Sequence, residues 1–512
     1  MPDALTQPAA TAPPRPPDSA DLRRRYRAAK ARQTPWQGLW QQCYDYALPQ
    51  RDSLSGATIP ADRQTDRLFD ATAPDAVDQL AASLLSQLTP PWSRWFALAP
   101  GRDLTASEHD RLSPVLEDAT QTLLAHLDRS NFALEMHQAF LDLVTVGTAC
   151  LHIDEAPPGG LSAFSFAAVP VGQLVLEENR AGQLDGIFRQ TELTLAGLRG
   201  RFPTAALPRH MAEEGSRNPD QRFTVVEAVV PDGPAFRYSV FRDDGAADIL
   251  LDRRLPHAPF IAFRWMKSPG EIYGRSPVMK ALPDIKTANK VVELVLKNAS
   301  IAVTGIWQAD DDGVLNPATI RLAPGAIIPK AVGSAGLKPL DMPGRFDVSQ
   351  LVLADLRGRI RHALLVDRLA QIDGRDMTAT EVLERSGEMA RLLGATYGRL
   401  QAELLAPLIE RLIRIARRRG DIPDLSADGR IVQIDFRSPL ARAQAQRDVQ
   451  ETLSWIRTAL GLGPEALQAL DIAAATRWLG RALGVPAELI RDAVPEAGGS
   501  PSPTDPPTQQ ES

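Results

Sequence analysis

One long amphipathic segment constrains this chain more than any other part of its sequence. The segment runs from Glu271 to Ile301 and reads EIYGRSPVMKALPDIKTANKVVELVLKNASI. Gly274 and Pro277 interrupt its start, and the rest has the period of a helix roughly 40 Å long. Pro283 is expected to kink this helix or to mark its first turn. Apolar residues cover a face wide enough for more than one neighbouring helix, so we expect the helix to be packed, embedded or lining something.

Three lysines of this helix align along its axis. At 100° per residue from Lys280, the side chains of Lys286, Lys290 and Lys297 fall at about 240°, 280° and 260°, which is a strip about 40° wide. Two interpretations remain open. The lysines extend from a packed helix to solvent, or they form a stripe that faces nucleic acid.

A second helix is predicted after a short insertion. Strand-like residues with Gly and Pro run from Thr304 to Leu340, and a helical pattern follows from about Asp347 to Ala370. The order predicts a helical hairpin with a small domain inserted at its tip. The acidic run 310–312 within the insertion lacks the alternating ligand spacing of a calcium loop, so it predicts a solvated turn instead of a metal site.

The N-terminal half combines helices with a β-rich region, which predicts the α+β class. Short strand-like runs separated by turns occupy Ala163 to Trp265. A chain of 512 residues exceeds what one hydrophobic core usually serves, so several structural units are expected. Helical patterns precede the β-rich region at Asp21–Ala47, Pro74–Leu88, Ser107–Asp128 and Phe132–Val144.

The C-terminal half is predicted to be helical. Its longest periodic segment runs from about Met377 to Arg419, begins with a capping box at Thr378 and Glu381, and ends before Gly420. Pro407 predicts a kink or break near the residue before it. Two or three further helices are expected within 440–493, whereas the proline-rich ends, 1–20 and 495–512, are expected to be disordered tails.

The sequence lacks the usual motifs of catalysis. It has no phosphate-binding P-loop, no His-Glu-x-x-His and no Gly-x-Ser-x-Gly, and its seven histidines lack ligand-like spacing. Cys43 and Cys150 stand alone and are expected to be reduced thiols. We therefore expect no catalytic, cofactor or metal site, and a protein that is not an enzyme.

Charge and hydropathy argue against a protein that adsorbs to nucleic acid over its whole surface, and against a membrane-spanning or secreted protein. The net charge of −6 gives no global reason to adsorb to nucleic acid. The basic run Arg23 to Arg32 favours a solvated helix face over phosphate contact. The start of the chain lacks a secretory signal, and no window approaches the roughly 18 apolar residues of a membrane span, so a soluble, non-exported protein is expected.

Four segments in the same order resemble one protein family. They are LFDATAPDAVDQLAASLLSQLTPPWSRWFAL, LVTVGTACLHIDE, RWMKSPGEIYGRSPVMKALPDIKTANKVVE and MTATEVLERSGEMARLLGATYGRLQAELLAPLIERL. Together they resemble the bacteriophage portal proteins, specifically the head-to-tail connecting proteins of short-tailed, T7-like phages. The resemblance covers roughly Arg23 to Arg419, and no signature of the family is recognised after Leu440.

The resemblance implies a particular α+β architecture. The portal fold has an α/β wing, a helical stem hairpin, a small clip domain inserted at the hairpin tip, and a helical crown. By position in this chain, the resemblance implies a wing at 21–270, stem helices at 271–303 and 347–365, a clip at 304–346, a tunnel loop at 366–376, a long wing helix at 377–420 and a crown at 421–494.

The resemblance also implies function and partners. Portal proteins form a ring, typically of twelve subunits, at one capsid vertex of the virion, and the ring is the channel for DNA packaging and ejection. It implies transient, sequence-independent contact with double-stranded DNA and docking of the terminase large subunit, major capsid and scaffolding proteins, and tail adaptors. Assembly would occur in the bacterial host cytoplasm, and ATP hydrolysis would belong to the terminase.

The charge balance fits a conduit better than a tight DNA binder. Each fixed cation that neutralises a phosphate adds affinity through counterion release, so a densely basic channel would hold duplex DNA. Twelve copies at −6 would carry −72, which suits a sparse set of cations on an acidic body. The candidate DNA contacts are Lys286, Lys290, Lys297, Arg368 and Arg375.

Two other functions remain as alternatives. A metal-dependent DNA-processing enzyme would need carboxylates brought together from several segments. A head-tail adaptor or another ring component of the virion would lack the helical hairpin and its inserted domain, and adaptors are usually much smaller than this chain.

Overall fold

The structure is a computed structural model, and it divides the chain into two compact units. The first unit comprises residues 1–83, 135–152 and 167–373, and the second comprises 84–134, 153–166 and 374–512. The residues that the structure describes are 19–51, 67–91, 93–101, 103–157, 159–243, 249–304, 307–308, 332, 338–339, 346–368, 394–424, 431–437, 439–461 and 471–483.

A five-stranded antiparallel sheet forms much of the first unit. Its strands follow one another in space as they do in sequence, β4 to β8, so each pairs with its neighbour along the chain. They are β4 Leu174–Glu178, β5 Leu184–Thr194, β6 Arg222–Asp232, β7 Ala235–Arg242 and β8 Ile249–Leu255. The prediction of a β-rich region is confirmed. It missed two short helices between β5 and β6, α5 Leu195–Arg201 and α6 Arg209–Arg217.

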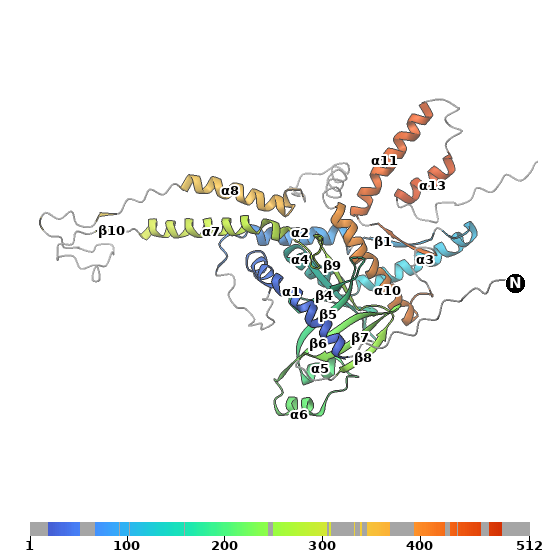
Figure 1. The fold of residues 1–512 in the computed structure, drawn as a ribbon. Helices are drawn as coiled ribbons and strands as arrows, with labels where there is room; N and C mark the ends of the chain where they lie inside the picture. Colours follow the sequence, from blue (N-terminus) through green and yellow to red (C-terminus); the bar gives the residue numbers. More distant parts are fainter. Residues whose placement is uncertain are drawn as a thin grey trace, which may run out of the picture. The chain divides into compact units, whose positions relative to one another are not determined.

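Helix α1, Ser19–Ala47, packs against this sheet (Figure 1). Leu22, Tyr26 and Ala29 recur at helical spacing and are fully buried. They form one core cluster with apolar side chains of β4 to β7, and each large side chain that is buried there contributes about 1.5–3 kcal/mol. The partners in the sheet are Val175, Phe188, Val226, Ala228, Val230 and Phe241.

The basic run on α1 pairs with polar side chains of the sheet. Arg25 donates to Glu177 at 2.6 Å, and Lys30 donates to Gln190 at 2.7 Å. Part of the basic run therefore holds α1 to the sheet. The sequence analysis considered only a solvated helix face or contact with phosphate.

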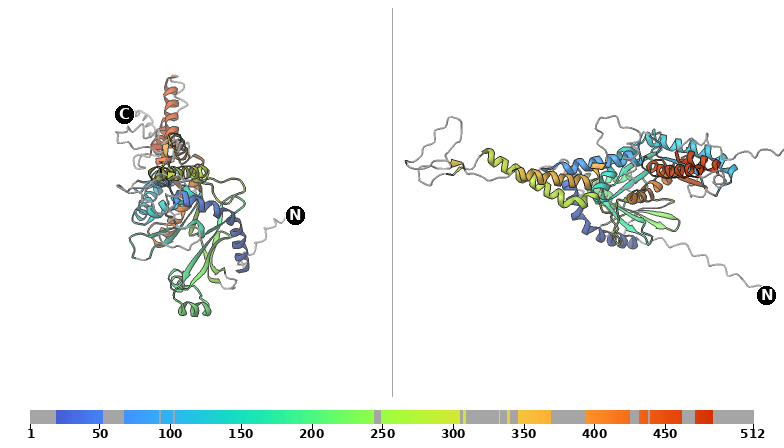
Figure 2. Two further views of the ribbon diagram at one scale, coloured as in Figure 1. Left: turned by 90° about the vertical axis from the view of Figure 1, so that its left-hand side faces the viewer. Right: turned by 90° about the horizontal axis from the view of Figure 1, so that it is seen from above.

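Two long helices follow the sheet in the first unit. Helix α7, Pro277–Thr304, and helix α8, Phe346–Ala363, contact each other and lie side by side in both Figure 1 and Figure 2. Between them in sequence, β10 Trp307–Gln308 pairs antiparallel with β11 Lys338–Pro339. The predicted pair of helices with strands between them is confirmed for these described residues. The acidic run 310–312 lies outside them.

The chain also has two further helices and a three-stranded sheet. Helix α4, Phe132–Val146, leads into β2, Thr148–Glu155, and α2 runs over Thr72–Leu88. Strand β2 is the central strand of a three-stranded sheet of order β3-β2-β9. The outer strands are β3 Phe164–Ala168 and β9 Phe260–Arg264.

In the second unit, a helix packs on a two-stranded sheet. Strand β1, Phe96–Pro100, pairs antiparallel with β12, Val432–Phe436, and α3, Ala106–Asp128, covers β1. The Thr120 hydroxyl accepts a hydrogen bond from the Leu98 N–H at 3.0 Å. Sequence analysis did not predict this pairing.

The break at Pro407 falls where the sequence predicted it. A π-helical turn, Gln401–Leu405, precedes α10, Ala406–Arg419, and the proline lies in the first turn of α10, where a missing N–H costs least. Gly420 ends the helix in the left-handed conformation with φ 84°, as predicted. The predicted capping box at Thr378 and Glu381 lies outside the described residues.

Two helices end the described part of the chain. They are α11, Pro439–Gly461, and α13, Ile472–Leu483, as the helical pattern predicted. Both predicted tails lie mainly outside the described residues.

Cys43 and Cys150 are buried free thiols, which confirms the prediction that they are thiols. Burial raises the pKa of each to about 12.

Candidate functional site

The candidate site is α7 and the residues that hold it. The first half of α7 is buried in the first unit, where Val278, Leu282 and Ile285 are each at most 5% exposed. Pro283 lies inside the continuous helix. The second half is largely exposed, so the helix is anchored at one end and projects from the other.

Two glycines allow two backbone segments to approach closely at the anchored end. Gly147 lies between α4 and β2, and Gly274 lies three residues before α7. A Cβ atom on Gly274 would lie 2.0 Å from the carbonyl oxygen of Gly147, and one on Gly147 would lie 2.5 Å from the carbonyl oxygen of Gly274. Gly147 also has φ 77°, which favours glycine. Only residues without side chains fit here.

Hydrogen bonds fix this contact on both sides. Gly274 donates its N–H to the Thr148 hydroxyl at 2.8 Å, and the Ser276 hydroxyl donates to the Thr145 carbonyl at 2.8 Å. The Trp265 N–H donates to the Gly147 carbonyl at 2.9 Å. The segment that leads into α7 is therefore a hydrogen-bonded joint.

A second anchor joins α7 and α8 to the start of α2. The Asn289 amide of α7 accepts from the Phe69 N–H at 2.6 Å and donates to the Arg67 carbonyl at 3.0 Å. Asp70 accepts from Arg357 of α8 at 2.8 Å. Burial opposes ionisation of Asp70, but hydrogen bonds from Thr72 and Arg357 outweigh it and hold its pKa below the usual value.

The three aligned lysines all have partners within the chain. Lys286 donates to Gln42 at 2.5 Å, and its ammonium lies 5.7 Å from the centre of the Tyr46 ring. Lys290 and Lys297 both pair with Glu293, at 2.9 Å and 2.5 Å. The hydrogen bonds from the two lysines lower the pKa of Glu293, so these three residues carry a net charge of +1.

The two candidate arginines are less completely described. Arg368 ends the short 3-10 helix Val366–Arg368 that follows α8, and its side chain lies outside the described residues. Arg375 lies outside them altogether. The structure brings the three lysines together on one helix and does not bring the arginines to them.

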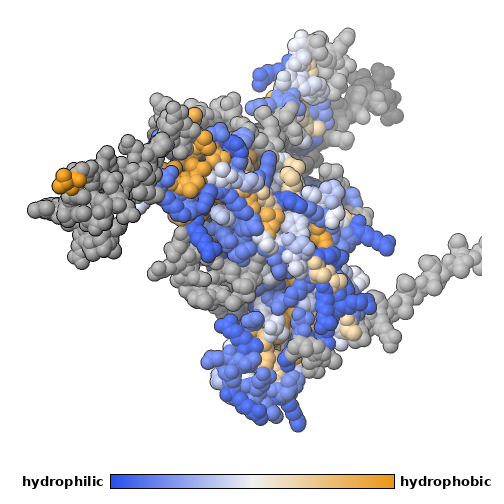
Figure 3. All heavy atoms as spheres, turned by 60° about the vertical axis from the view of Figure 1, so that its left-hand side comes forward, coloured by the Kyte–Doolittle hydropathy of each residue, from blue (hydrophilic) through white to orange (hydrophobic). Residues whose placement is uncertain are grey.

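Apolar side chains are exposed on the outer halves of α7 and α8. Leu294 and Leu296 are 48% and 52% exposed, and Leu351 and Val352 of α8 are 75% and 45% exposed. Figure 3 shows apolar residues gathered over this part of the helix pair. We call these four residues the stem patch. Leu294 and Leu296 lie two residues apart and so point to different sides of α7, which leaves apolar side chains exposed on more than one face of the helix pair; exposed apolar surface of this kind marks an interaction site more often than solvated positions do.

A buried carboxylate lies on α4 beside the joint. Asp142 is 1% exposed, accepts from the Tyr44 hydroxyl at 2.8 Å and pairs with Arg51 at 2.7 Å. Burial raises its pKa to about 6, although Arg51 and the bond from Tyr44 act in the opposite direction. The folded protein therefore binds a proton at Asp142 more tightly than an unfolded chain does.

This shift predicts a pH-dependent stability. Because the pKa of Asp142 is raised in the folded state, its contribution is fully present below pH 4 and is lost as the pH rises through about 6. A shift of this size corresponds to about 2–3 kcal/mol. Asp142→Asn keeps an acceptor for Tyr44 and should raise the stability at pH 7.5 relative to pH 5 by about 1–1.5 kcal/mol, the part of this contribution that is lost between the two pH values, measured by denaturant unfolding at both.

The control for this prediction is the exposed carboxylate Asp355. Asp355→Asn should leave the difference between the two pH values unchanged. An Asp142→Asn variant with the same pH dependence as the original chain would contradict the assignment of the buried proton to Asp142.

The described residues hold neither a group of three potential metal ligands among His, Cys, Asp and Glu nor a helix long and apolar enough to cross a membrane. The histidine His126 has a structural role. His126 accepts from the Ala163 N–H through Nδ1 at 3.1 Å and lies 3.5 Å from Asp421 through Nε2.

Sequence reasoning missed the partners that define this site. Glu293 was detectable, because it lies three residues after Lys290 and four before Lys297, the spacings at which helical side chains meet. The pairs of Asp70 with Arg357 and of Asp142 with Arg51 span long stretches of sequence, and no local pattern indicates them.

Known proteins are similar to this chain over most of its length. A family model described as bacteriophage head to tail connecting protein matches residues 19–490. The probable portal protein of Bordetella phage BPP-1 is 26% identical over 493 residues, which cover 89% of this chain and 85% of that protein. The portal protein of Escherichia phage T7 is 21% identical over 409 residues, which cover 78% and 75%. A solved neck of an empty gene transfer agent particle aligns with 80% of this chain and 90% of its own, at 14% identity and a TM-score of 0.38.

Proposed function

The chain belongs to the family of bacteriophage head to tail connecting proteins and is a portal connector, and we propose that its copies form a ring around a DNA channel. The family match over residues 19–490 bears out the resemblance that four sequence segments indicated. The relatives named above are portal proteins, and the match supports neither a DNA-processing enzyme nor a separate adaptor.

The stem patch is the observation that carries the ring. A single copy leaves Leu294, Leu296, Leu351 and Val352 in water, although burial of each would contribute about 1.5–3 kcal/mol. Neighbouring copies can cover these side chains with different faces of the same two helices. A contact between two different faces repeats from copy to copy, and it closes into a ring when the rotation between copies closes.

The size of the assembled protein tests this proposal. Analytical ultracentrifugation of the purified chain at increasing concentration should show one large species, which we propose is a dodecamer. A protein that stays a single copy at every concentration would contradict ring formation through the stem patch.

We also propose that the ring passes duplex DNA through transient, sequence-independent contacts. The candidate contacts are those named from the sequence, Lys286, Lys290, Lys297, Arg368 and Arg375. The shared carboxylate of Glu293 supports passage over retention, because it halves the charge that Lys290 and Lys297 present. Weak fixed charge limits counterion release and so limits the affinity for DNA.

Changing the net charge of Lys290, Glu293 and Lys297 should change how strongly the ring holds DNA. Glu293→Gln removes the shared acid, so DNA retention should strengthen and fall more steeply with salt. Lys290→Gln with Lys297→Gln should have the opposite effect. The measurement is the fraction of DNA that stays bound to assembled rings across a salt series.

Lys280 provides the matched control, because it is exposed on α7 about 80° or more away from the stripe. Lys280→Gln should leave retention unchanged, and every variant should still assemble. If all the variants retain DNA equally, the aligned lysines of α7 have a structural role and do not contact DNA.

The remaining assignments are part of the same proposal. The ring would lie at one capsid vertex of the virion after assembly in the host cytoplasm, and it would dock the terminase large subunit, capsid and scaffolding proteins, and tail adaptors. The proposed regions are a wing at 21–270, stem helices at 271–303 and 347–365, a clip at 304–346, a tunnel loop at 366–376, a long wing helix at 377–420 and a crown at 421–494.

A further inference from the structure

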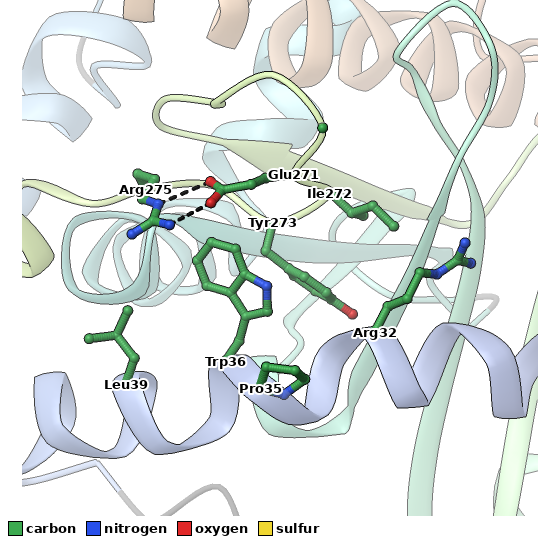
Figure 4. Close-up of a pocket in the computed structure, with 9 residues that line it drawn as sticks. Arg32, Pro35, Trp36, Leu39, Glu271, Ile272, Tyr273 and Arg275 are labelled. Atoms are coloured by element: carbon green, nitrogen blue, oxygen red, sulfur yellow. Dashed lines mark hydrogen bonds and ion pairs between the residues drawn. The ribbon is translucent and has the colours of Figure 1, made fainter.

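A hollow of about 430 Å³ opens on the first unit between α1 and the segment before α7. Figure 4 shows Pro35, Trp36 and Leu39 on the α1 side, with Ile272 and Tyr273 opposite them. The wall is mainly apolar and aromatic. Neither the two close-packed glycines, Gly147 and Gly274, nor the candidate DNA contacts line this hollow.

The aromatic wall is held rigid by its own contacts. The Trp36 ring lies 6.0 Å from the Tyr273 ring, and the Arg275 guanidinium lies 5.0 Å from the centre of the Trp36 indole. Tyr273 accepts a hydrogen bond from the Leu176 N–H at 3.1 Å, and Glu271 pairs with Arg275. A ligand that binds here therefore does not have to order Trp36 first, which reduces the entropic cost of binding.

At one end of the hollow, two arginines share one carboxylate. The Arg32 guanidinium lies 3.9 Å from Glu177, which Arg25 already holds at 2.6 Å. At the other end, the bidentate contact between Arg275 and Glu271 neutralises both groups. An occupant should therefore place an acidic group beside Arg32 and should carry no cation there.

Rigid aromatic grooves of this kind suit proline-rich segments. Proline fixes φ near −65°, so such segments favour the polyproline II conformation and lose little entropy on binding. Outside the described residues, two segments of this chain have the Pro-x-x-Pro spacing. One is PPRPP at 13–17, and the other is PTDP at 503–506.

Charge distinguishes the two segments. The N-terminal one carries Arg15, which would lie close to Arg32 or Arg275. The C-terminal one carries Asp505, and residues 492–512 contain four acidic residues and no Lys or Arg. Reach excludes the N-terminal segment of the same copy, because Trp36 lies 17 residues along α1 from Ser19, or about 25 Å, whereas Pro13 is only six residues before Ser19 and spans at most about 22 Å.

We propose that this hollow binds the proline-rich segment 500–508 of this chain, with its prolines on Trp36 and Asp505 beside Arg32. The hollow would then be a docking site for the C-terminal tail. The proposal does not depend on the ring or on DNA passage, so it can fail while the proposed function holds.

A peptide titration tests the proposal on the full chain. The protein carries Pro503→Ala and Pro506→Ala, so that its own tail does not compete, and a fluorescent peptide of residues 498–512 is added. Fluorescence anisotropy should show saturable binding. A peptide with Asp505→Lys should bind up to about fivefold more weakly, because one exposed charge pair contributes up to about 1 kcal/mol, and a peptide with both prolines replaced by alanine should also bind more weakly, because it is not held in the polyproline II conformation.

A charge exchange in the protein makes the test specific. Arg32→Glu should weaken binding of the 498–512 peptide about fivefold or more and should favour the Asp505→Lys peptide. Arg24→Glu is the control, because Arg24 lies on the same helix and its side chain is 79% exposed but does not line the hollow. Circular dichroism of both variants checks that they are folded.

Three results would overturn the proposal. The first is the absence of saturable binding by the 498–512 peptide. The second is equal weakening by Arg32→Glu and Arg24→Glu. The third is tighter binding by a peptide of residues 8–18, which would assign the hollow to the N-terminal segment of another copy.

Discussion

Replacing Gly274 with alanine is expected to cost at least about 4 kcal/mol of unfolding free energy, a large part of the stability of a typical protein. The new Cβ would lie 2.0 Å from the Gly147 carbonyl oxygen, and both atoms belong to the backbone wall of the joint. Neither backbone can withdraw without losing hydrogen bonds, because Gly274 donates to Thr148 and Gly147 accepts from Trp265. Denaturant unfolding followed by circular dichroism measures the loss, and the yield of soluble protein reports it if the variant does not fold.

Gly38 provides the matched control. It lies inside α1, and a Cβ built there would meet no atom within 4 Å. Gly38→Ala should therefore be neutral or should stabilise the protein by about 0.5–1 kcal/mol. Gly147→Ala should be as harmful as Gly274→Ala, because it meets the same contact from the other side. A Gly274→Ala variant within about 1 kcal/mol of the original chain would contradict the close contact at the joint.

Placing charges in the stem patch is expected to abolish assembly while the single copy stays folded. Leu296→Asp with Leu351→Asp removes two leucines that would each contribute about 1.5–3 kcal/mol when a neighbour covers them. It also adds two carboxylates that would be buried without partners. The loss per contact between neighbours is at least about 3–6 kcal/mol, which raises the dissociation constant by a factor of about 10² to 10⁴. Mass photometry should find single copies where the original chain forms the large species.

Leu161 is the control for the stem patch. It is 83% exposed and does not lie on α7 or α8. Leu161→Asp should assemble normally, and circular dichroism should show equal helix content in all these variants. If the double variant assembles as well as the Leu161 variant, the stem patch does not join neighbouring copies.

The features that sequence predicted here are those with local physical causes. The periodicity of apolar residues predicted α7, and the missing N–H of Pro407 predicted the break before α10. Gly420 ended a helix for the same kind of reason, since few other residues adopt a positive φ readily. Each of these signals lies within a few residues of the structure that it predicts.

The features that sequence missed depend on contacts between distant segments. Strand β1 pairs with β12 across more than 300 residues, and each strand has only five residues. Such a pairing has no local periodicity to reveal it. Asp142 had no neighbour in sequence that indicated Arg51 or Tyr44, so its raised pKa could not be foreseen.

The candidate site was predicted in part. Sequence placed Lys286, Lys290 and Lys297 on one strip of α7, but it did not include Glu293, which pairs with two of them. Nor did it predict that the outer halves of α7 and α8 would expose the stem patch, because exposure depends on where the rest of the unit ends. Only the structure therefore shows which charged side chains of α7 are paired and which of its apolar side chains are exposed.

Electron microscopy of the purified full chain tests the ring most directly. The account predicts closed rings with a central channel, with the α7 and α8 helices of neighbouring copies in contact through the stem patch. Particles that remain single copies under all conditions, in a preparation that cleaves DNA when divalent metal is added, would contradict it.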